Sequence, residues 1–169
     1  MKQMRMLAVA MALLVGTAVM SAQDSKIAHI ATQELVQAMP SYKAASADIA
    51  KLQKTYDSTI NEMGTELQKT LERYGREAET QTDEENIRRQ QEVEATRNKI
   101  LEYRQNALQD LQKKEAELMK PIVEKARETI KTVARSKGYT YVLDSSPGSG
   151  VIMAEGYNLM ADVKAKLGI

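Results

Sequence analysis

Apolar residues recur every three or four positions over much of this chain, which is the pattern of long amphipathic helices. The first such stretch runs from Tyr42 to Ala78 in ten steps over 36 residues, a mean of 3.6 residues per step. This period is closer to a straight helix than to the 3.5-residue repeat of a left-handed supercoil. At 1.5 Å per residue, a helix over residues 42–80 is roughly 58 Å long, more than a small globular domain needs. The apolar positions of this predicted helix are Tyr42, Ala45, Ile49, Leu52, Tyr56, Ile60, Met63, Leu67, Leu71, Tyr74 and Ala78.

A polar segment separates this helix from a second one. Residues 75–86 hold no large apolar side chain, and Thr82 followed by Glu85 has the form of a capping box that begins a helix. Gly138 ends the second helix, and Pro121 within it predicts a kink or a loosened turn. Its predicted apolar stripe comprises Ile87, Leu101, Leu108, Leu111, Leu118, Ile122, Ala126, Ile130 and Val133. The two helices should pair as an antiparallel hairpin.

The segment before the hairpin predicts a strand and a short helix. Residues 27–31 are mostly apolar and β-prone. Thr32 is expected to cap a short helix that Pro40 ends, and Ser41 is expected to cap the long helix that follows. The apolar side of the short helix would be formed by Leu35, Val36 and Met39.

The segment after the hairpin predicts two strands and a last helix. Residues 139–144 and 151–154 are β-prone, and the Ser-, Pro- and Gly-rich residues 145–150 form a loop between them. Asn158 is expected to cap a helix that ends at Gly168. Because a hairpin returns the chain to its starting point, the strand before it and the strands after it can meet in one small sheet.

The predicted fold is therefore α+β: a small β-rich oligomerisation head that carries a long antiparallel helical hairpin, a coiled-coil-like arm. Residues 23–41 and 137–169 form the head, and residues 42–136 form the arm with its turn near 75–86. A three-stranded sheet with two open edges is marginally stable alone, so we expect the head to oligomerise. The expected interface residues are Ile27, Ile30, Tyr141, Leu143 and Ile152.

The first 22 residues have the form of a secretory signal peptide. Lys2 and Arg5 precede an uncharged apolar run over residues 6–20, and small residues Ser21 and Ala22 follow. The run is short for a membrane span, so a membrane anchor is the less favoured alternative. We expect cleavage near Ala22, export, and no integral membrane anchor in the mature chain.

Composition excludes several classes of chemistry. The chain has no Cys, Phe or Trp and a single histidine, His29, which rules out thiol nucleophiles and sites with several histidines. Asp144, Ser145 and Ser146 lack a nearby base in the sequence, and the acids at 83–85 favour a helix start over a cation site. We therefore predict no enzyme, no catalytic residue, no metal and no cofactor. Nucleic-acid binding is disfavoured because 24 basic and 23 acidic residues nearly cancel.

Charge is distributed unevenly along the predicted arm. Residues 77–94 hold seven acids and two arginines, whereas residues 113–137 hold eight bases and four acids. The arm is thus acidic at its tip and basic near its base. A basic wall could attract acidic partners, but an ordinary solvated face with ion pairs along the helix is the more economical interpretation.

Three segments resemble the Skp/OmpH family of periplasmic chaperones. Residues 26–30 and 33–42 are similar to the opening of that family, and residues 118–122 and 134–144 to its return into the head. Residues 162–169 are similar to its closing helix. The resemblance implies a jellyfish-shaped homotrimer in the periplasm, whose arms enclose a cavity that holds unfolded outer-membrane proteins without ATP.

Such a holdase needs many weak apolar contacts rather than one tight site. The candidate client-binding residues on the arm are Tyr56, Ile60, Met63, Leu67, Tyr74, Ile87, Ile100 and Tyr103. The alternative for most of them is that they only pack the two helices together. The alternative function is an exported coiled-coil spacer or adaptor with one defined folded partner.

Overall fold

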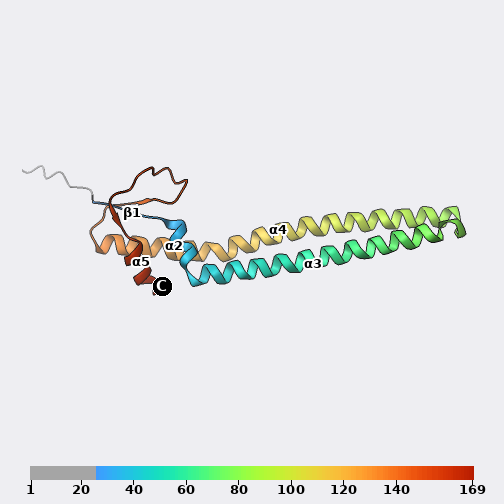
Figure 1. Ribbon diagram of the computed structural model, residues 1–169, viewed down its shortest axis with the longest axis horizontal. Coiled ribbons are helices and arrows are strands. Elements are labelled where there is room, and N and C mark those ends of the chain that lie inside the picture. Colours follow the sequence, from blue (N-terminus) through green and yellow to red (C-terminus); the bar gives the residue numbers. More distant parts are fainter. Residues whose placement is uncertain (1–25) are drawn as a thin grey trace, which may run out of the picture.

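Two long antiparallel helices form an arm that projects from a small head (Figure 1). The computed structural model describes residues 26–169, and the predicted signal peptide lies outside the described residues. Helix α3 spans Pro40–Glu77, a short 3-10 turn η1 spans Ala78–Thr80, and helix α4 spans Asp83–Ser136. At 1.5 Å per residue, α3 is about 57 Å long and α4 about 81 Å. The longer return helix therefore reaches past the start of α3 and enters the head.

The ends of the arm helices agree with the sequence in part. The Thr82 hydroxyl accepts a hydrogen bond from the backbone N–H of Glu85 at 3.2 Å, which confirms the predicted cap of α4. The short helix before Pro40 ends at Ala38, as predicted, and Pro40 is itself the first residue of α3, where a proline loses no helical hydrogen bond. Met39, not Ser41, is the residue that precedes the helix. Pro121 lies inside an unbroken α4.

The contact between α3 and α4, here called the arm seam, follows a coiled-coil repeat. With Thr59 left out, the buried and half-buried positions of α3 run from Tyr42 to Glu77 in ten steps of three or four residues, a mean of 3.5. On α4, the buried residues Val93, Ile100 and Ala107 are seven positions apart. This 3.5-residue repeat keeps α3 and α4 in contact along the whole seam. The sequence alone had predicted the 3.6-residue period of a straight helix.

The predicted stripe of α4 is correct near the head and wrong along the outer arm. Ile122, Ala126, Ile130 and Val133 are buried, but Ile87, Leu101 and Leu108 are 56–60% exposed. The seam instead uses Ile100 and Ala107, the immediate neighbours of the two leucines. Adjacent apolar residues point about 100° apart on a helix, so the sequence alone did not decide which of each pair faces α3.

The head sheet joins segments from the two ends of the described chain. Strand β1 (Ile27–Ile30) lies between β2 (Tyr141–Asp144) and β3 (Tyr157–Asn158), and both pairings are parallel. The meeting of segments before and after the hairpin is as predicted. The strand predicted at residues 151–154 is wrong, because these residues are irregular and the third strand begins at Tyr157.

Two short helices complete the head. Helix α2 (Thr32–Ala38) follows β1, and helix α5 (Met160–Leu167) follows β3 and ends at Gly168, whose φ of 75° suits glycine. The Asn158 side chain accepts a hydrogen bond from the N–H of Met160 at 2.9 Å, so it caps the first turn of α5 from the end of β3.

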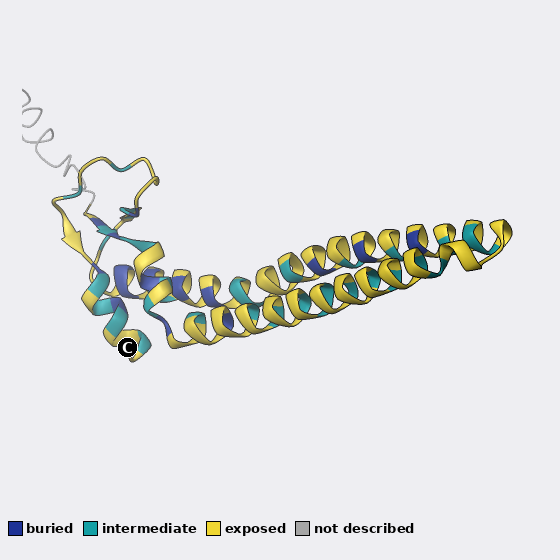
Figure 2. Ribbon diagram, turned by 45° about the vertical axis from the view of Figure 1, so that its right-hand side comes forward, coloured by how far each residue is buried: buried dark blue, intermediate teal, exposed yellow. Residues whose placement is uncertain are grey.

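The core of the head forms where the sheet meets the base of α4. Ala28 and Ile30 of β1 belong to one buried cluster with Ala126 and Ile130 of α4, and its other members come from α2, α3, the rest of the α4 base and the region of α5. Figure 2 shows buried residues concentrated in the head, while the arm is mostly exposed apart from its seam. Because side chains alternate along a strand, the other face of the sheet points away from α4.

The corrected seam can be tested with two neighbouring residues. Ile100→Ala removes a buried side chain and should lower stability by about 2–4 kcal/mol. Leu101→Ala, its matched control, changes an exposed position and should alter stability by less than about 0.5 kcal/mol. Urea unfolding at a fixed protein concentration measures both, and a larger loss for Leu101→Ala would show that α4 has the opposite register.

Candidate functional site

Seven of the eight candidate client-binding residues lie in the arm seam. Ile100 is buried, and the six others on the seam are half-buried. The Tyr56 and Tyr103 rings meet edge to face with centroids 6.0 Å apart. The Tyr56 hydroxyl donates to the Asp110 carboxylate at 2.7 Å, and this hydrogen bond raises the pKa of Tyr56. These residues pack the two helices together, and the half-buried ones are Tyr56, Ile60, Met63, Leu67, Tyr74 and Tyr103.

Apart from Leu71 on α3, which is 39% exposed, the large exposed apolar residues of the arm lie instead on α4. Ile87, Leu101 and Leu108, here called the outer stripe, are each more than half exposed. They are separated by 14 and 7 residues, so in a 3.5-residue repeat they fall on one line along the helix. Of the eight sequence candidates only Ile87 belongs to this line. Leu101 and Leu108 were missed because their apolar character assigned them to the seam.

The tip of the arm is a cluster of paired charges. The Arg89 guanidinium lies over the Tyr74 ring at 4.6 Å and binds Glu77 at 2.8 Å and Glu85 at 3.1 Å. Hydrogen bonding to Arg88 outweighs burial and, with further bonding to Arg89, lowers the pKa of Glu85 to about 2. Because Glu77 ends α3 and Arg89 lies in α4, the Arg89–Glu77 pair joins the two helices at the turn, whereas Glu85 lies in α4 itself. The acidic residues of the tip are therefore partly neutralised.

Asp144 organises the junction between β2 and α2. Its carboxylate accepts hydrogen bonds from the N–H and hydroxyl of Thr32 and from the N–H and hydroxyl of Ser146. The Ser146 hydroxyl oxygen in turn accepts from the N–H of Gln33 at 3.0 Å. Thr32 is thus not the N-cap predicted from sequence. The start of α2 is capped by side chains that lie more than 100 residues away in the sequence.

The polar side chains of the Asp144–Ser146 segment have structural roles. Burial would raise the pKa of Asp144, but the hydrogen bonds from Thr32 and Ser146 prevail and hold it at about 2. His29 lies across the ends of the 145–156 loop, with Nδ1 3.0 Å from the Ser145 hydroxyl and Nε2 3.1 Å from the Gly156 carbonyl oxygen. These polar side chains hold the backbone in place. Among residues 26–169 there is no cluster of three potential metal ligands.

The predicted oligomer-interface residues divide between the two faces of the sheet. Ile27, Tyr141 and Leu143 are 43–57% exposed on the strands, and Ile152 is fully exposed on the 145–156 loop. Ile30 is completely buried inside its own chain, packed toward α4. It therefore offers no surface to a second copy, so the prediction of Ile30 as an interface residue is wrong. The alternation of the strand explains this difference.

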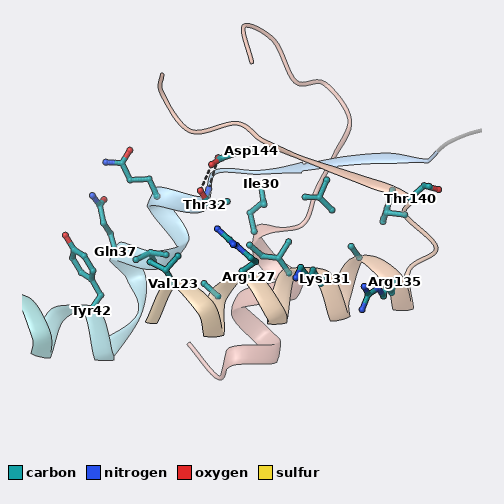
Figure 3. Close-up of a pocket in the computed structure, with 17 residues that line it drawn as sticks. Ile30, Thr32, Gln37, Tyr42, Val123, Arg127, Lys131, Arg135, Thr140 and Asp144 are labelled. Atoms are coloured by element: carbon teal, nitrogen blue, oxygen red, sulfur yellow. Dashed lines mark hydrogen bonds between the residues drawn. The ribbon is translucent and has the colours of Figure 1, made fainter. Parts of the chain in front are cut away.

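A groove of about 700 Å³, here called the head groove, lies between β2 and the base of α4 (Figure 3). Its apolar lining includes Ile30, Val123, Ala126, Ile130 and Val142. Figure 3 shows Arg127, Lys131 and Arg135 along α4, each four residues from the next, so that one side of the groove is basic. The sequence indicated a basic arm base, but not a groove, because β2 comes from a distant segment.

Comparison with known proteins matches this architecture. The profile of the family described as outer membrane protein (OmpH-like) matches residues 26–167, nearly all of the described chain. The chain belongs to the OmpH-like family. The profile spans the head strands, both arm helices and α5, so the OmpH-like assignment covers every element of the structure.

Individual OmpH-like proteins are also similar to this chain in sequence and in structure. The chaperone protein Skp of Photorhabdus luminescens is 28% identical over 138 residues, covering 82% of each chain. The chaperone protein Skp of Photorhabdus laumondii is 28% identical over 121 residues, covering 72% of this chain and 73% of that relative. A solved structure from Caulobacter crescentus, described as an OmpH-like outer membrane chaperone, has a TM-score of 0.73 at 12% identity, covering 83% of this chain and 82% of that one. That structure shares the α+β fold of a small head and a long helical arm.

No helix within residues 26–169 is long and apolar enough to cross a membrane.

The Asp144 network predicts a dependence of stability on pH. Because the pKa of Asp144 is lowered in the folded state, its stabilising effect is complete above pH 4 and is lost as the pH falls toward 2. Asp144→Asn should reduce stability at pH 7 by about 1–2 kcal/mol and by much less at pH 2. Thermal unfolding at both pH values measures this, with the exposed Asp57→Asn as control. An equal loss at the two pH values would mean that the carboxylate charge is not what stabilises α2.

Proposed function

We propose that this OmpH-like protein is an ATP-independent periplasmic holdase. It binds unfolded outer-membrane proteins between helical arms and prevents their aggregation. The observation that carries this proposal is the outer stripe, in which large apolar side chains stay exposed on a rigid arm that its own chain does not cover. Single exposed apolar residues are ordinary on a protein surface, but these three share one face of α4 and therefore offer a partner a line of apolar contacts.

The outer stripe has the chemistry that a varied, unfolded client requires. Its three residues are spaced along the helix, and the face around Leu101 and Leu108 also carries Arg97, Arg104 and neutral amides. Single apolar contacts of this kind are weak, and several together retain a chain without fixing one conformation. The long stems of the arginines add apolar area, and their charges favour acidic segments.

The holdase acts as a homotrimer assembled through its heads. Supporting this is the exposed apolar face of the sheet, formed by Ile27, Tyr141 and Leu143. Burying these side chains against other copies would also protect the open edges of β2 and β3. Three arms that leave one assembled head could then surround a client.

A structural spacer or adaptor is the second candidate function. The regular seven-residue spacing of Val93, Ile100 and Ala107 favours it, because such a seam suits a stiff rod. In that case the outer stripe would receive one helix of a folded partner and not an unfolded chain.

Suppression of aggregation separates the two functions. The mature protein beginning at Gln23 is mixed, without nucleotide, with a urea-unfolded outer-membrane barrel on dilution, and light scattering is followed. A holdase suppresses scattering and elutes with one client for three copies. The spacer becomes the leading function if the client aggregates as fast as in buffer.

Substitutions on the arm then identify the contact surface. Changing Ile87, Leu101 and Leu108 together to Ser should weaken client retention by about tenfold or more while leaving the trimer mass unchanged. The matched control changes the half-buried Tyr56, Met63 and Tyr74 to Ser. Because these residues pack the seam, this variant should lower the free energy of unfolding of the protein more than it weakens client retention. Unchanged client affinity in the first variant would remove the outer stripe from the binding surface.

Leu143→Asp tests assembly through the sheet face. A carboxylate at this exposed strand position, once buried between copies, would lack a partner and oppose association. We expect a folded monomer by light-scattering chromatography, with an unchanged circular dichroism spectrum. A trimer of unchanged mass would place the interface elsewhere on the head.

A further inference from the structure

The far end of the arm contains a hollow that its own side chains do not fill. This space, here called the tip hollow, has a volume of about 580 Å³ and lies between α3 and α4 beside the turn that joins them. That turn is at the end of the arm farthest from the head (Figure 1). The apolar lining of the hollow is Leu71, Tyr74 and Val93. A concave and partly apolar space of this volume is within the range of sites that enclose a ligand group.

The tip hollow lies beside the outer stripe. Glu94 is seven residues before Leu101, so in a seven-residue repeat it falls on the same line along α4. Gln90 and Arg97 lie three residues before and four residues after the seam residue Val93, which places them between the seam and that line. Glu94, Gln90 and Arg97 all line the hollow. A polypeptide held along the outer stripe therefore passes the hollow, which makes such a polypeptide its favoured occupant.

The charged side chains around the hollow are paired with one another. Arg97 binds Glu94 at 3.5 Å. Arg89 binds Glu77 at 2.8 Å and Glu85 at 3.1 Å. A charged occupant would meet both signs of charge here and would have to compete with these pairs. The electrostatics of the hollow therefore favour an uncharged side chain.

The guanidinium of Arg89 favours an aromatic side chain over an aliphatic one. The Arg89 side chain is 12% exposed and lines the hollow, and the Tyr74 ring lies 4.6 Å from its guanidinium carbon. Its Nε and Nη2 atoms donate to Glu85 and Glu77, whereas Nη1 is buried without a hydrogen-bond partner among residues 26–169. An aromatic ring stacks on a guanidinium plane and accepts an N–H group on its face, and an aliphatic side chain does neither.

We propose that the tip hollow binds one aromatic side chain of an extended, unfolded polypeptide whose neighbouring residues continue along the outer stripe. The ring lies among Leu71, Tyr74 and Val93, with Arg89 beside it. This inference rests on the holdase of the proposed function and gives that holdase a preference for segments that contain an aromatic residue. Binding requires no opening of the hairpin, because the hollow exists in the folded arm.

A peptide that contains tryptophan tests the hollow without background fluorescence, because the chain has no tryptophan. The probe is a short, capped peptide of Gly and Ser with one central Trp, and its emission is followed as the mature protein is added. We expect a saturable blue shift. The same peptide with Phe should compete about fivefold better than the peptide with Leu, because aromatic contacts add to the burial of apolar area. A version with photoreactive benzoylphenylalanine should label the protein within residues 71–97.

Gly75 allows the hollow to be closed without disturbing the fold. It lines the hollow, it has no positive φ, and a Cβ atom added to it would meet nothing within 4 Å. Gly75→Leu should therefore weaken binding of the Trp peptide by about fivefold or more. The same substitution should raise the thermal midpoint by about 2 °C, because leucine favours a helix more than glycine does.

Gly64→Leu is the matched control. Gly64 is an exposed position of the same helix, has the same free space around it and lies outside the hollow. This variant should raise the thermal midpoint by a similar amount and leave peptide binding unchanged. Leu71→Ser, which removes one apolar wall of the hollow, replaces Gly75→Leu if that variant folds poorly, and it should also weaken binding.

The outcomes separate this inference from the proposed function. Equal competition by the Phe and Leu peptides would overturn the aromatic preference. Unchanged peptide binding in the folded Gly75→Leu or Leu71→Ser variant would overturn the tip hollow as the site. Either result leaves the holdase proposal standing if the natural protein still suppresses aggregation of the client. Binding of the Trp peptide in the hollow by a protein that does not suppress aggregation would support the site and remove the holdase.

Discussion

The packing of the α4 base beneath the head sheet is the contact on which the rest of the structure depends. The sheet is short, all parallel and open at both edges, so it has little stability of its own. Ile30 and Ala28 are buried in the same cluster as Ala126 and Ile130 of α4. Parallel strands also require a crossover between them, and here the whole arm serves as that crossover. The arm and the head therefore fold as one unit, since the return helix is part of the core of the head.

Polar interactions then fix what the apolar core brings together. Asp144 holds the start of α2 at the end of β2, and Lys137 at the end of α4 binds Asp162 of α5 at 2.8 Å. A hydrogen bond to Asp162 raises the pKa of Lys137, so both groups stay charged over the neutral range. Each of these contacts joins elements far apart in sequence. These contacts orient the short helices of the head more than they add to the free energy of unfolding, because partly exposed pairs contribute little free energy.

Much of this architecture could be predicted from the sequence, since the helices, the turn, the Thr82 cap and the Gly138 stop depend on local patterns. The predictions that were wrong have a common cause: each depended on a contact between segments far apart in the sequence. Leu101 resembles Ile100 in every local respect, and only the contact with α3 decides which is buried. Thr32 is of a residue type that favours the N-cap position, but the side chain that caps α2 is Asp144, 112 residues away in the sequence. Ile30 and Leu143 are both apolar strand residues, and only the position of α4 distinguishes the core from the surface. The head groove likewise needs both β2 and α4 in place before it exists.

Which residues of α4 face α3 also determines how the arm can act on a partner. Residues that pack the seam cannot bind a client without opening the hairpin, and the contacts of Arg89 in α4 with Glu77 and Tyr74 in α3 oppose such opening. A surface outside the seam needs no such rearrangement. The outer stripe leaves apolar area exposed while the seam supplies stability, so one helix has separate faces for folding and for binding. Neighbouring pairs such as Ile100 and Leu101 make this possible, because one step along the helix turns the next side chain by about 100°, enough to take it out of the seam. The ambiguity that misled the sequence interpretation is thus the same feature that lets a two-helix arm remain folded and still present apolar residues to a partner.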